Sequence, residues 1–217
     1  MQSKKSSLMK DAFALFAITL VAALSLGFVY EITKDIIAKR EAEAKAQAYA
    51  AVYAEAALVD DKNEELNSMV ASSADFLTEN GFTDTTINEV CIAKDSNGNA
   101  IGYVMTITSH AGYGGDIKFS MGVKADGTLT KIEILQISET AGLGMKALEE
   151  PFKSQFTEVN ADQLTVIKAA ADKSSPSEIN AISGATVTSN AITNTVNAGL
   201  AFAGELMNEG IGGVVRE

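Results

Sequence analysis

The sequence has one cysteine, one histidine, two prolines and no tryptophan among its 217 residues. A single cysteine, Cys91, excludes an intramolecular disulfide, a four-cysteine iron–sulfur site, a c-type haem attachment site and a cysteine-based zinc cage. A single histidine, His110, excludes HExxH and multi-histidine metal sites. We therefore expect no metal site, and any electron transfer would have to use an organic cofactor.

Positive charge is also scarce, with 17 Lys and Arg against 28 Asp and Glu and a net charge of −11. Binding to nucleic acid depends on clustered basic residues that neutralise phosphates, and the sequence has no basic stripe. The nucleotide-binding pattern GxxxxGK[ST] and the hydrolase pattern GxSxG are absent as well. We expect no nucleic-acid partner and no catalytic residues that act on their own.

Near the N-terminus the sequence contains a long uncharged run, AFALFAITLVAALSLGFVY, from Ala12 to Tyr30. As a helix it would span about 28 Å, close to the ~30 Å hydrocarbon core of a bilayer. We interpret residues 11–30 as one transmembrane helix surrounded by membrane lipid, and residues 1–10 as a cytoplasmic tail. A cleaved signal peptide is the alternative, because lysines precede the run, but the run is longer than a typical signal h-region and no A-x-A-like site closes it.

The orientation of this helix does not follow from counting basic residues. Three lysines precede the run and four basic residues follow it: Lys34, Lys39, Arg40 and Lys45. Long domains, however, translocate largely regardless of their charge. We expect a protein of the cell membrane whose N-terminus is cytoplasmic and whose remaining chain lies outside the cytoplasm.

The chain after the membrane run divides into a helical part and a sheet-forming part. Residues 31–58 are rich in Ala, Glu, Lys and Ile and contain no helix breaker, which predicts a solvated helical stalk. A partner-binding coiled coil is the alternative, but the segment lacks a sustained heptad. Together with a polar junction, the stalk is expected to occupy residues 31–84 and a folded domain residues 85–210.

Turn signals between short apolar segments predict an antiparallel sheet in this domain. One hairpin is expected over residues 90–109, with its turn at Asn97-Gly98, and a second over residues 116–137, with its turn at Asp126-Gly127. One face of the sheet would be buried, and Ile117, Phe119, Met121 and Val123 would lie on it. We interpret Cys91 as a small core residue rather than a redox thiol, and His110 as a turn or packing residue.

The last strong element is an amphipathic helix, whose apolar stripe runs from Ile192 through Val196, Leu200 and Ala203 to Met207. Helix and strand pieces are also expected between the second hairpin and this helix. The pattern as a whole predicts an α+β fold: a single N-terminal transmembrane helix, a helical stalk, and a domain built on an antiparallel sheet with flanking helices.

Residues 183–189 read SGATVTS, so four of seven side chains carry hydroxyls and the others are Gly, Ala and Val. This stretch is expected immediately before the last helix, where free backbone N–H groups and the helix dipole favour an anion. A phosphate site is one interpretation. The other requires no ligand, because Ser and Thr can simply cap the helix while Gly184 makes a turn.

The extended stretch AISGATVTS resembles the flavinylation motif of the FMN-binding domain found in the G subunit of Rnf complexes and in the C subunit of sodium-pumping NADH:quinone reductases. GYGGDI, at residues 112–117, and SETAGLG, at residues 138–144, resemble two further loops of that family. With the membrane helix, the similarity spans residues 10 to about 207. The resemblance implies that FMN is joined through its phosphate to the side-chain oxygen of Thr186. Because a threonine hydroxyl is a weak nucleophile, a separate flavin transferase would have to make this bond.

The resemblance also implies the remaining residues of a flavin site. Gly184 and Ala185 would give the phosphate access to Thr186, and Ser183 and Thr188 could donate hydrogen bonds to it. The flavin ring would meet five residues of the second loop: Glu139, Thr140, Gly142, Leu143 and Gly144. Tyr113 would stack on the ring or, as the alternative, would be a surface packing residue of its glycine-rich turn.

Two positions depart from the family pattern. Ala141 stands where proline is usual, which would loosen the second loop. Asn180 replaces an aspartate six residues before the modified threonine, which could reduce the efficiency of flavin attachment unless Glu178 substitutes.

The function that the resemblance implies is electron transfer between neighbouring membrane subunits of a complex that couples ferredoxin and NAD+ redox chemistry to Na+ or H+ movement. The membrane run carries no charge, so the ion path would lie in other subunits. The C subunit of a Na+-translocating NADH:quinone reductase, or another exported FMN-domain electron carrier, is an alternative, although the compact sheet without long insertions favours the Rnf type. A redox-inert, membrane-anchored interaction module is the alternative of a different class.

Overall fold

The computed structural model describes the backbone of residues 2–215 and the side chains of residues 9–215. Met1 and the side chains of residues 2–8, which belong to the expected cytoplasmic tail, lie outside the described part. The chain forms two compact units, Met1–Ala44 and Lys45–Glu217. Helix α1 (Gln2–Val52) makes up the first unit and extends into the second.

In the first unit, the part of α1 from Met9 onward contains a stretch long and apolar enough to cross a membrane, judged by length and composition. The side chains of this stretch are not buried by the rest of the described chain. Its hydroxyl groups are satisfied within the helix: Thr19 Oγ1 donates to the Phe16 carbonyl at 2.9 Å, and Ser25 Oγ donates to the Val21 carbonyl at 2.8 Å. Such internal pairing suits an apolar environment, where an unpaired polar group is costly.

The end of α1 differs from the sequence-based expectation. The helix ends at Val52, six residues before Leu58, and the chain continues into strand β1 (Leu58–Asp60), which pairs with β2 (Thr85–Lys94). A further helix, α2 (Glu64–Glu79), lies in the segment expected to be stalk and junction. The folded unit thus begins at Lys45, well before residue 85.

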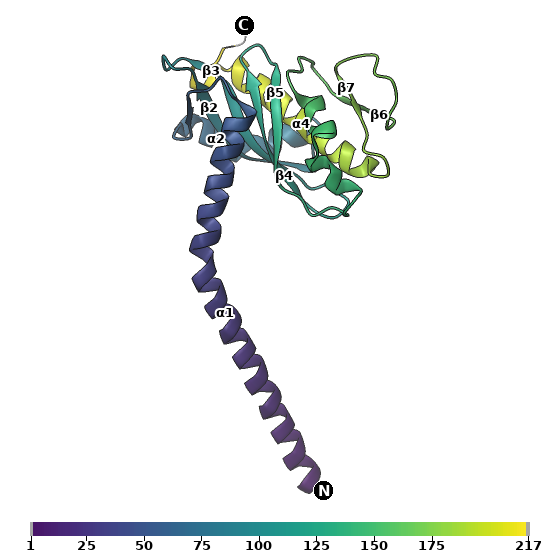
Figure 1. Ribbon diagram of the computed structural model, residues 1–217. Helices are drawn as coiled ribbons and strands as arrows, with labels where there is room; N and C mark the ends of the chain where they lie inside the picture. Colours follow the sequence, from purple (N-terminus) through teal and green to yellow (C-terminus); the bar gives the residue numbers. More distant parts are fainter. Residues whose placement is uncertain (1, 216–217) are drawn as a thin grey trace. The chain divides into compact units, whose positions relative to one another are not determined.

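A five-stranded antiparallel sheet forms the centre of the second unit, in the order β1-β2-β3-β4-β5 (Figure 1). Both expected hairpins are confirmed: β2 pairs with β3 (Ala100–Ser109), and β4 (Ile117–Lys124) pairs with β5 (Leu129–Gln136). Gly98 and Gly127 occupy the two turns with a φ of 86°. That left-handed backbone conformation is why each turn requires glycine.

The main core lies between one face of the sheet and helices α2 and α4 (Thr186–Asn208). Phe119, Met121 and Ile132 on the sheet and Val196 and Phe202 on α4 are all essentially inaccessible to solvent. Gly199 allows α4 to approach the sheet, because a Cβ at that position would collide with the Met121 sulfur. The absence of a side chain at Gly199 therefore allows this close packing of α4 on the sheet.

The opposite face of the sheet is also buried, although the sequence indicated only one buried face. Tyr49 and Val52, in the last turns of α1, and Tyr53 beyond its end form a second cluster with residues of β2 and β3: Cys91, Ala93 and Val104. The Tyr49 hydroxyl lies 2.9 Å from Thr106 Oγ1 and donates to Glu89 Oε2 at 3.2 Å. Since Lys45 forms an ion pair with the same carboxylate, the end of α1 is part of the domain.

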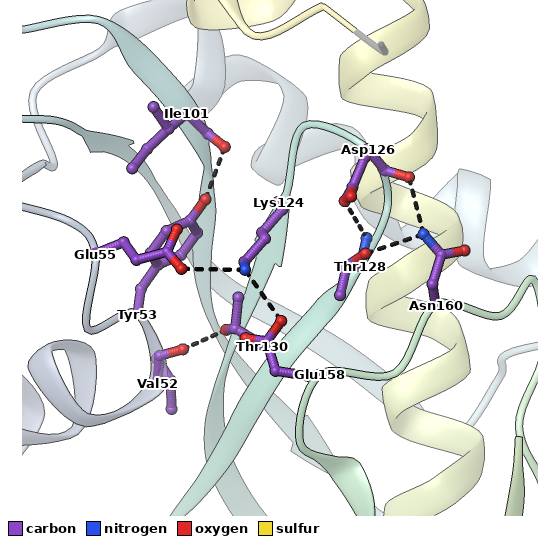
Figure 2. Close-up of polar contacts among 10 residues, drawn as sticks. All are labelled: Val52, Tyr53, Glu55, Ile101, Lys124, Asp126, Thr128, Thr130, Glu158 and Asn160. Carbon is purple, nitrogen blue, oxygen red and sulfur yellow. Dashed lines mark hydrogen bonds and ion pairs between the residues drawn. The ribbon is translucent and has the colours of Figure 1, made fainter. Parts of the chain in front are cut away.

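Further polar contacts join the end of α1 and the residues that follow it to strands β3, β4 and β5 (Figure 2). Tyr53 donates its hydroxyl proton to the Ile101 carbonyl at 2.7 Å, and Thr130 Oγ1 donates to the Val52 carbonyl. Lys124 Nζ lies 3.0 Å from a Glu158 carboxylate oxygen and 3.2 Å from one of Glu55. The hydrogen bond to Glu158 is the main cause that raises the pKa of Lys124.

The interpretation of Cys91 as a core residue is confirmed, since it is buried at 0% exposure. Burial raises the pKa of its thiol from 9.0 to about 12, and the nearby Glu89 carboxylate adds to this effect. Because the folded-state pKa lies above the unfolded-state value, the contribution to stability is complete below pH 9 and is lost as the pH rises toward 12.

We therefore expect the free energy of unfolding to fall less with pH in Cys91→Ala than in the original protein. One proton contributes about 1.4 kcal/mol per pH unit. Between about pH 8 and pH 10, the free energy of unfolding should therefore fall by roughly 1.4 kcal/mol more in the original protein than in Cys91→Ala. Urea unfolding of the detergent-solubilised protein, followed by circular dichroism, measures it. Parallel pH curves for the two proteins would contradict the assignment.

Short elements connect β5 to α4: the 3-10 helices η1 (Gly144–Leu148) and η2 (Ser154–Phe156), with helix α3 (Glu150–Lys153) between them, and then strands β6 (Thr165–Ile167) and β7 (Glu178–Asn180). The last two strands pair in parallel. A final 3-10 helix, η3 (Ile211–Gly213), follows α4. The expected α+β class, with a long apolar N-terminal helix and an antiparallel sheet with flanking helices, is confirmed.

Candidate functional site

A surface hollow of about 580 Å³ lies where α4 begins. Three segments far apart in the sequence line it: the loop after β3, the loop after β5, and the start of α4. The lining residues are Tyr113, Glu139, Thr140, Leu143, Gly144, Gly184, Ala185, Thr186, Val187 and Thr188. All but two of the residues that the sequence assigns to a flavin site are thus brought together; Gly142 and Ser183 do not line the hollow.

Thr186 is the first residue of α4 and its side chain is exposed. The helix starts inside the SGATVTS stretch, not after it as expected. Ala185 precedes the helix and offers no side-chain cap, and the first hydrogen bond of the helix runs from the Ser189 N–H to the Ala185 carbonyl at 3.1 Å. The N–H groups of the first turn are therefore free of intrahelical partners, and the Thr186 hydroxyl lies beside them.

The other hydroxyls of this stretch are placed differently. Ser189 is buried; its Oγ accepts from the Ile182 N–H at 2.9 Å and donates to the Ala185 carbonyl at 3.0 Å, which fixes the turn into the helix. Thr188 is 1% exposed. Ser183 is exposed but lines a separate hollow of about 200 Å³ beside α3. Thr186 is the one hydroxyl of residues 183–189 that is both exposed and inside the larger hollow.

The loop of residues 138–144 forms a tight turn in which the Thr140 carbonyl accepts from the N–H groups of Leu143 at 3.1 Å and Met145 at 3.2 Å. Gly142 adopts a φ of 75°, which an L-residue rarely adopts. These bonds close the turn although Ala141 replaces the usual proline. A Cβ on Gly144 would lie 2.7 Å from Glu139 and 2.8 Å from Thr188 Oγ1, so glycine is needed for the loop to pack on α4.

Glu139 joins this loop to the loop after β3. Its Oε1 accepts a hydrogen bond from the Tyr113 N–H at 2.8 Å. Gly114 permits the contact between the two loops, because a Cβ there would collide with the Ser138 carbonyl. The Tyr113 side chain remains 75% exposed at the mouth of the hollow.

Sequence reasoning missed Val187, which is 52% exposed at the mouth of the hollow together with Leu143 and Tyr113. It also missed the bond between Glu139 and Tyr113. The sequence did contain a signal for Val187, because this residue lies within the SGATVTS stretch but outside the buried stripe of α4. The bond depends on two loops that only the folded sheet brings together.

Three other residues that the sequence pointed to lie outside the hollow. His110 bridges Thr86 and Asp116, with both ring nitrogens 2.9 Å from their partners, as a turn residue would. The Asn180 side chain accepts from the Ala171 N–H at 3.0 Å and donates to the Ala171 carbonyl at 3.1 Å, which holds the loop between β6 and β7. The Glu178 carboxylate is bonded to Ser174 of the same loop.

Comparison with known proteins places these segments in a family. Residues 112–201 match the FMN-binding domain, and residues 1–52 match the RnfG N-terminal region. The first of these matches includes every residue assigned to the hollow. The two matches together cover the long helix and the site.

Similar proteins of known name indicate the same family. The chain is 31% identical over 194 residues to the G subunit of the proton-translocating ferredoxin:NAD(+) oxidoreductase complex of Clostridium ljungdahlii, covering 86% of this chain and 90% of that protein. It is 40% identical over 109 residues to the G subunit of the Na(+)-translocating ferredoxin:NAD(+) oxidoreductase complex of Acetobacterium woodii, covering 50% and 52%. The crystal structure of NqrC from Shewanella oneidensis superposes with a TM-score of 0.47 at 17% identity, over 54% of this chain and 59% of that one. With its apolar N-terminal helix and its FMN-binding domain, the chain belongs to the family of G subunits of ion-translocating oxidoreductase (Rnf) complexes.

Proposed function

We propose that this subunit carries FMN covalently, as a phosphoester to Thr186, and relays electrons within its membrane complex. The observation that carries the assignment is the position of the Thr186 hydroxyl. It is exposed, lies in the hollow of about 580 Å³, and starts a 23-residue helix whose first N–H groups have no side-chain cap. Thr188 is a less suitable attachment site for FMN because its side chain is buried.

The residues of the hollow suit both ends of the cofactor. A phosphate on Thr186 would lie at the positive end of the α4 dipole, where the N–H groups of Val187 and Thr188 can donate to it. Tyr113, Leu143 and Val187 offer apolar surface for the ring, and Thr140 and Gly144, from the same turn as Leu143, complete this part of the lining. FMN supplies the redox chemistry when bound, while the protein binds and orients it.

Covalent attachment would solve a retention problem, since a flavin lost outside the cytoplasm could not be replaced from a cytoplasmic pool. The weak nucleophilicity of threonine requires a flavin transferase as a partner. Gly184, with a φ of 77°, and the small Ala185 leave the approach to Thr186 open.

The experiment that tests the assignment is in-gel fluorescence of the denatured full-length protein, co-expressed with a flavin transferase. A fluorescent band is expected. A dark band, when the same transferase modifies a control substrate, would contradict covalent attachment and give a redox-inert interaction module equal standing.

The relatives support a place in a complex that couples ferredoxin:NAD+ oxidoreduction to ion movement. One relative is named for protons and another for Na+, so this subunit is not expected to select the ion. We propose that it takes an electron from one neighbouring membrane subunit and passes it to another. Its apolar span carries no charge between Ala12 and Tyr30, so the ion path belongs to other subunits.

We further propose that residues 11–30 cross the cell membrane, with residues 1–10 in the cytoplasm and the flavin domain outside it. The test is a cysteine at position 215, where Val215 is 64% exposed, in a Cys91→Ala background. A membrane-impermeant maleimide added to intact cells is expected to label this cysteine. Labelling that occurs only after cell lysis would reverse the orientation.

A further inference from the structure

The charge in the hollow comes from one side chain. Among its ten lining residues, Glu139 alone carries an ionisable acid or base other than the Tyr113 phenol. None of the ion pairs formed by the described side chains involves Glu139. Its carboxylate charge is therefore not compensated by a neighbouring cation within the described part of the chain.

The position of this carboxylate is fixed from two sides. Oε1 is held by the Tyr113 N–H at 2.8 Å. A Cβ on Gly144 would lie only 2.7 Å from both Glu139 Cβ and Oε2, and a Cβ on Gly112 would lie 3.1 Å from Oε1. The glycines thus let the backbones of two loops close around the carboxylate, which holds it in the wall of the hollow.

We infer that Glu139 is a positioning and electrostatic residue that lowers the reduction potential of a flavin bound in this hollow. The inference rests on the proposed function. When a reductant gives up one electron and the flavin accepts it, the hollow gains one negative charge beside a fixed carboxylate. Repulsion between the two charges makes that uptake less favourable, and no proton need move at Glu139 for the effect to operate.

The expected size follows from removing one charge at the edge of a partly open site. Neutralising Glu139 should shift the equilibrium toward reduced flavin by about tenfold, which corresponds to a rise of about 59 mV in the one-electron potential. Glu139→Gln is the appropriate change, since its amide oxygen can still accept from the Tyr113 N–H while the charge is lost.

The experiment measures the flavin potential by spectroelectrochemical titration, with dye mediators supplying the electrons, in full-length detergent-solubilised protein. Covalent flavin content is first measured in the original protein, Glu139→Gln and a matched control, Glu209→Gln. Glu209 is exposed and directly follows the 23-residue helix α4, so about 35 Å along the helix separates it from Thr186. The control removes the same charge beyond the Debye length.

A second variant, Glu139→Asp, keeps the charge and shortens the side chain by one methylene. Its potential is expected to stay close to that of the original protein, because the charge of residue 139, and not its shape, produces the effect.

The outcomes separate this inference from the proposed function. A raised potential in Glu139→Gln, with values in Glu139→Asp and Glu209→Gln close to that of the original protein, supports it. An unchanged potential in Glu139→Gln, or an equal rise in Glu139→Asp, with flavin fully attached, overturns the role of the Glu139 charge and leaves the proposed function standing. An original protein without covalent flavin overturns both.

Discussion

Thr186→Val is expected to abolish covalent flavin attachment completely while the protein still folds. Valine keeps the shape of the side chain and removes the hydroxyl oxygen that would form the phosphoester. The exposed position of Thr186 means that no buried hydrogen bond is lost, so the free energy of unfolding should change by less than about 0.5 kcal/mol relative to the unloaded original protein. In-gel fluorescence after co-expression with a flavin transferase measures attachment.

The matched control is Thr188→Val, which makes the same change two residues further along. Thr188 is buried at 1% exposure, so a transferase cannot reach its hydroxyl in the folded domain. This variant should keep its fluorescence, and mass spectrometry should locate FMN on residue 186. Loss of signal in Thr188→Val with retention in Thr186→Val would move the attachment site. Loss in neither variant would place the flavin elsewhere.

Phe202→Ala is expected to be among the most destabilising single truncations in the domain. Phe202 is 1% exposed on α4, and its ring meets that of Phe76 on α2 edge-on, with 5.5 Å between centroids. Truncating a buried phenylalanine to alanine costs about 3–5 kcal/mol, a large share of the roughly 5–15 kcal/mol that stabilises a typical domain. The melting temperature should fall by roughly 6–20 °C.

Leu148→Ala is the control for this prediction, because Leu148 is a 41% exposed aliphatic residue in η1 and should lose less than about 1 kcal/mol. Thermal and urea unfolding of the full-length protein in detergent, followed by circular dichroism, compare the two. Equal losses would mean that α4 does not depend on this contact. A disproportionate loss in Phe202→Ala would show that packing of α4, which positions Thr186 at its first residue, depends on the core beneath it.

Much of the fold was predictable because local patterns decide it. The turn residues Asn97-Gly98 and Asp126-Gly127 and the alternation from Ile117 to Val123 specify two hairpins without reference to the rest of the chain. The stripe from Ile192 to Met207 likewise specifies the last helix. The end of α1 was not predictable in this way, because nothing in residues 53–58 breaks a helix by composition alone. Burial of Tyr49, Val52 and Tyr53 on the outer face of the sheet decides it.

The sequence by itself determined the type of protein: an apolar helix long enough for a membrane, an acidic chain with one cysteine and one histidine, and three motifs that resemble one flavin-binding family. Only the tertiary structure decided which residues share a site. It brings Tyr113, Glu139 and Thr186 to one hollow and leaves Ser183 outside it. It also buries Thr188 and exposes Thr186, although both are threonines of the same motif. The physical reason is that side chains two positions apart on a helix point to different sides, and the sheet beneath α4 determines which side faces solvent.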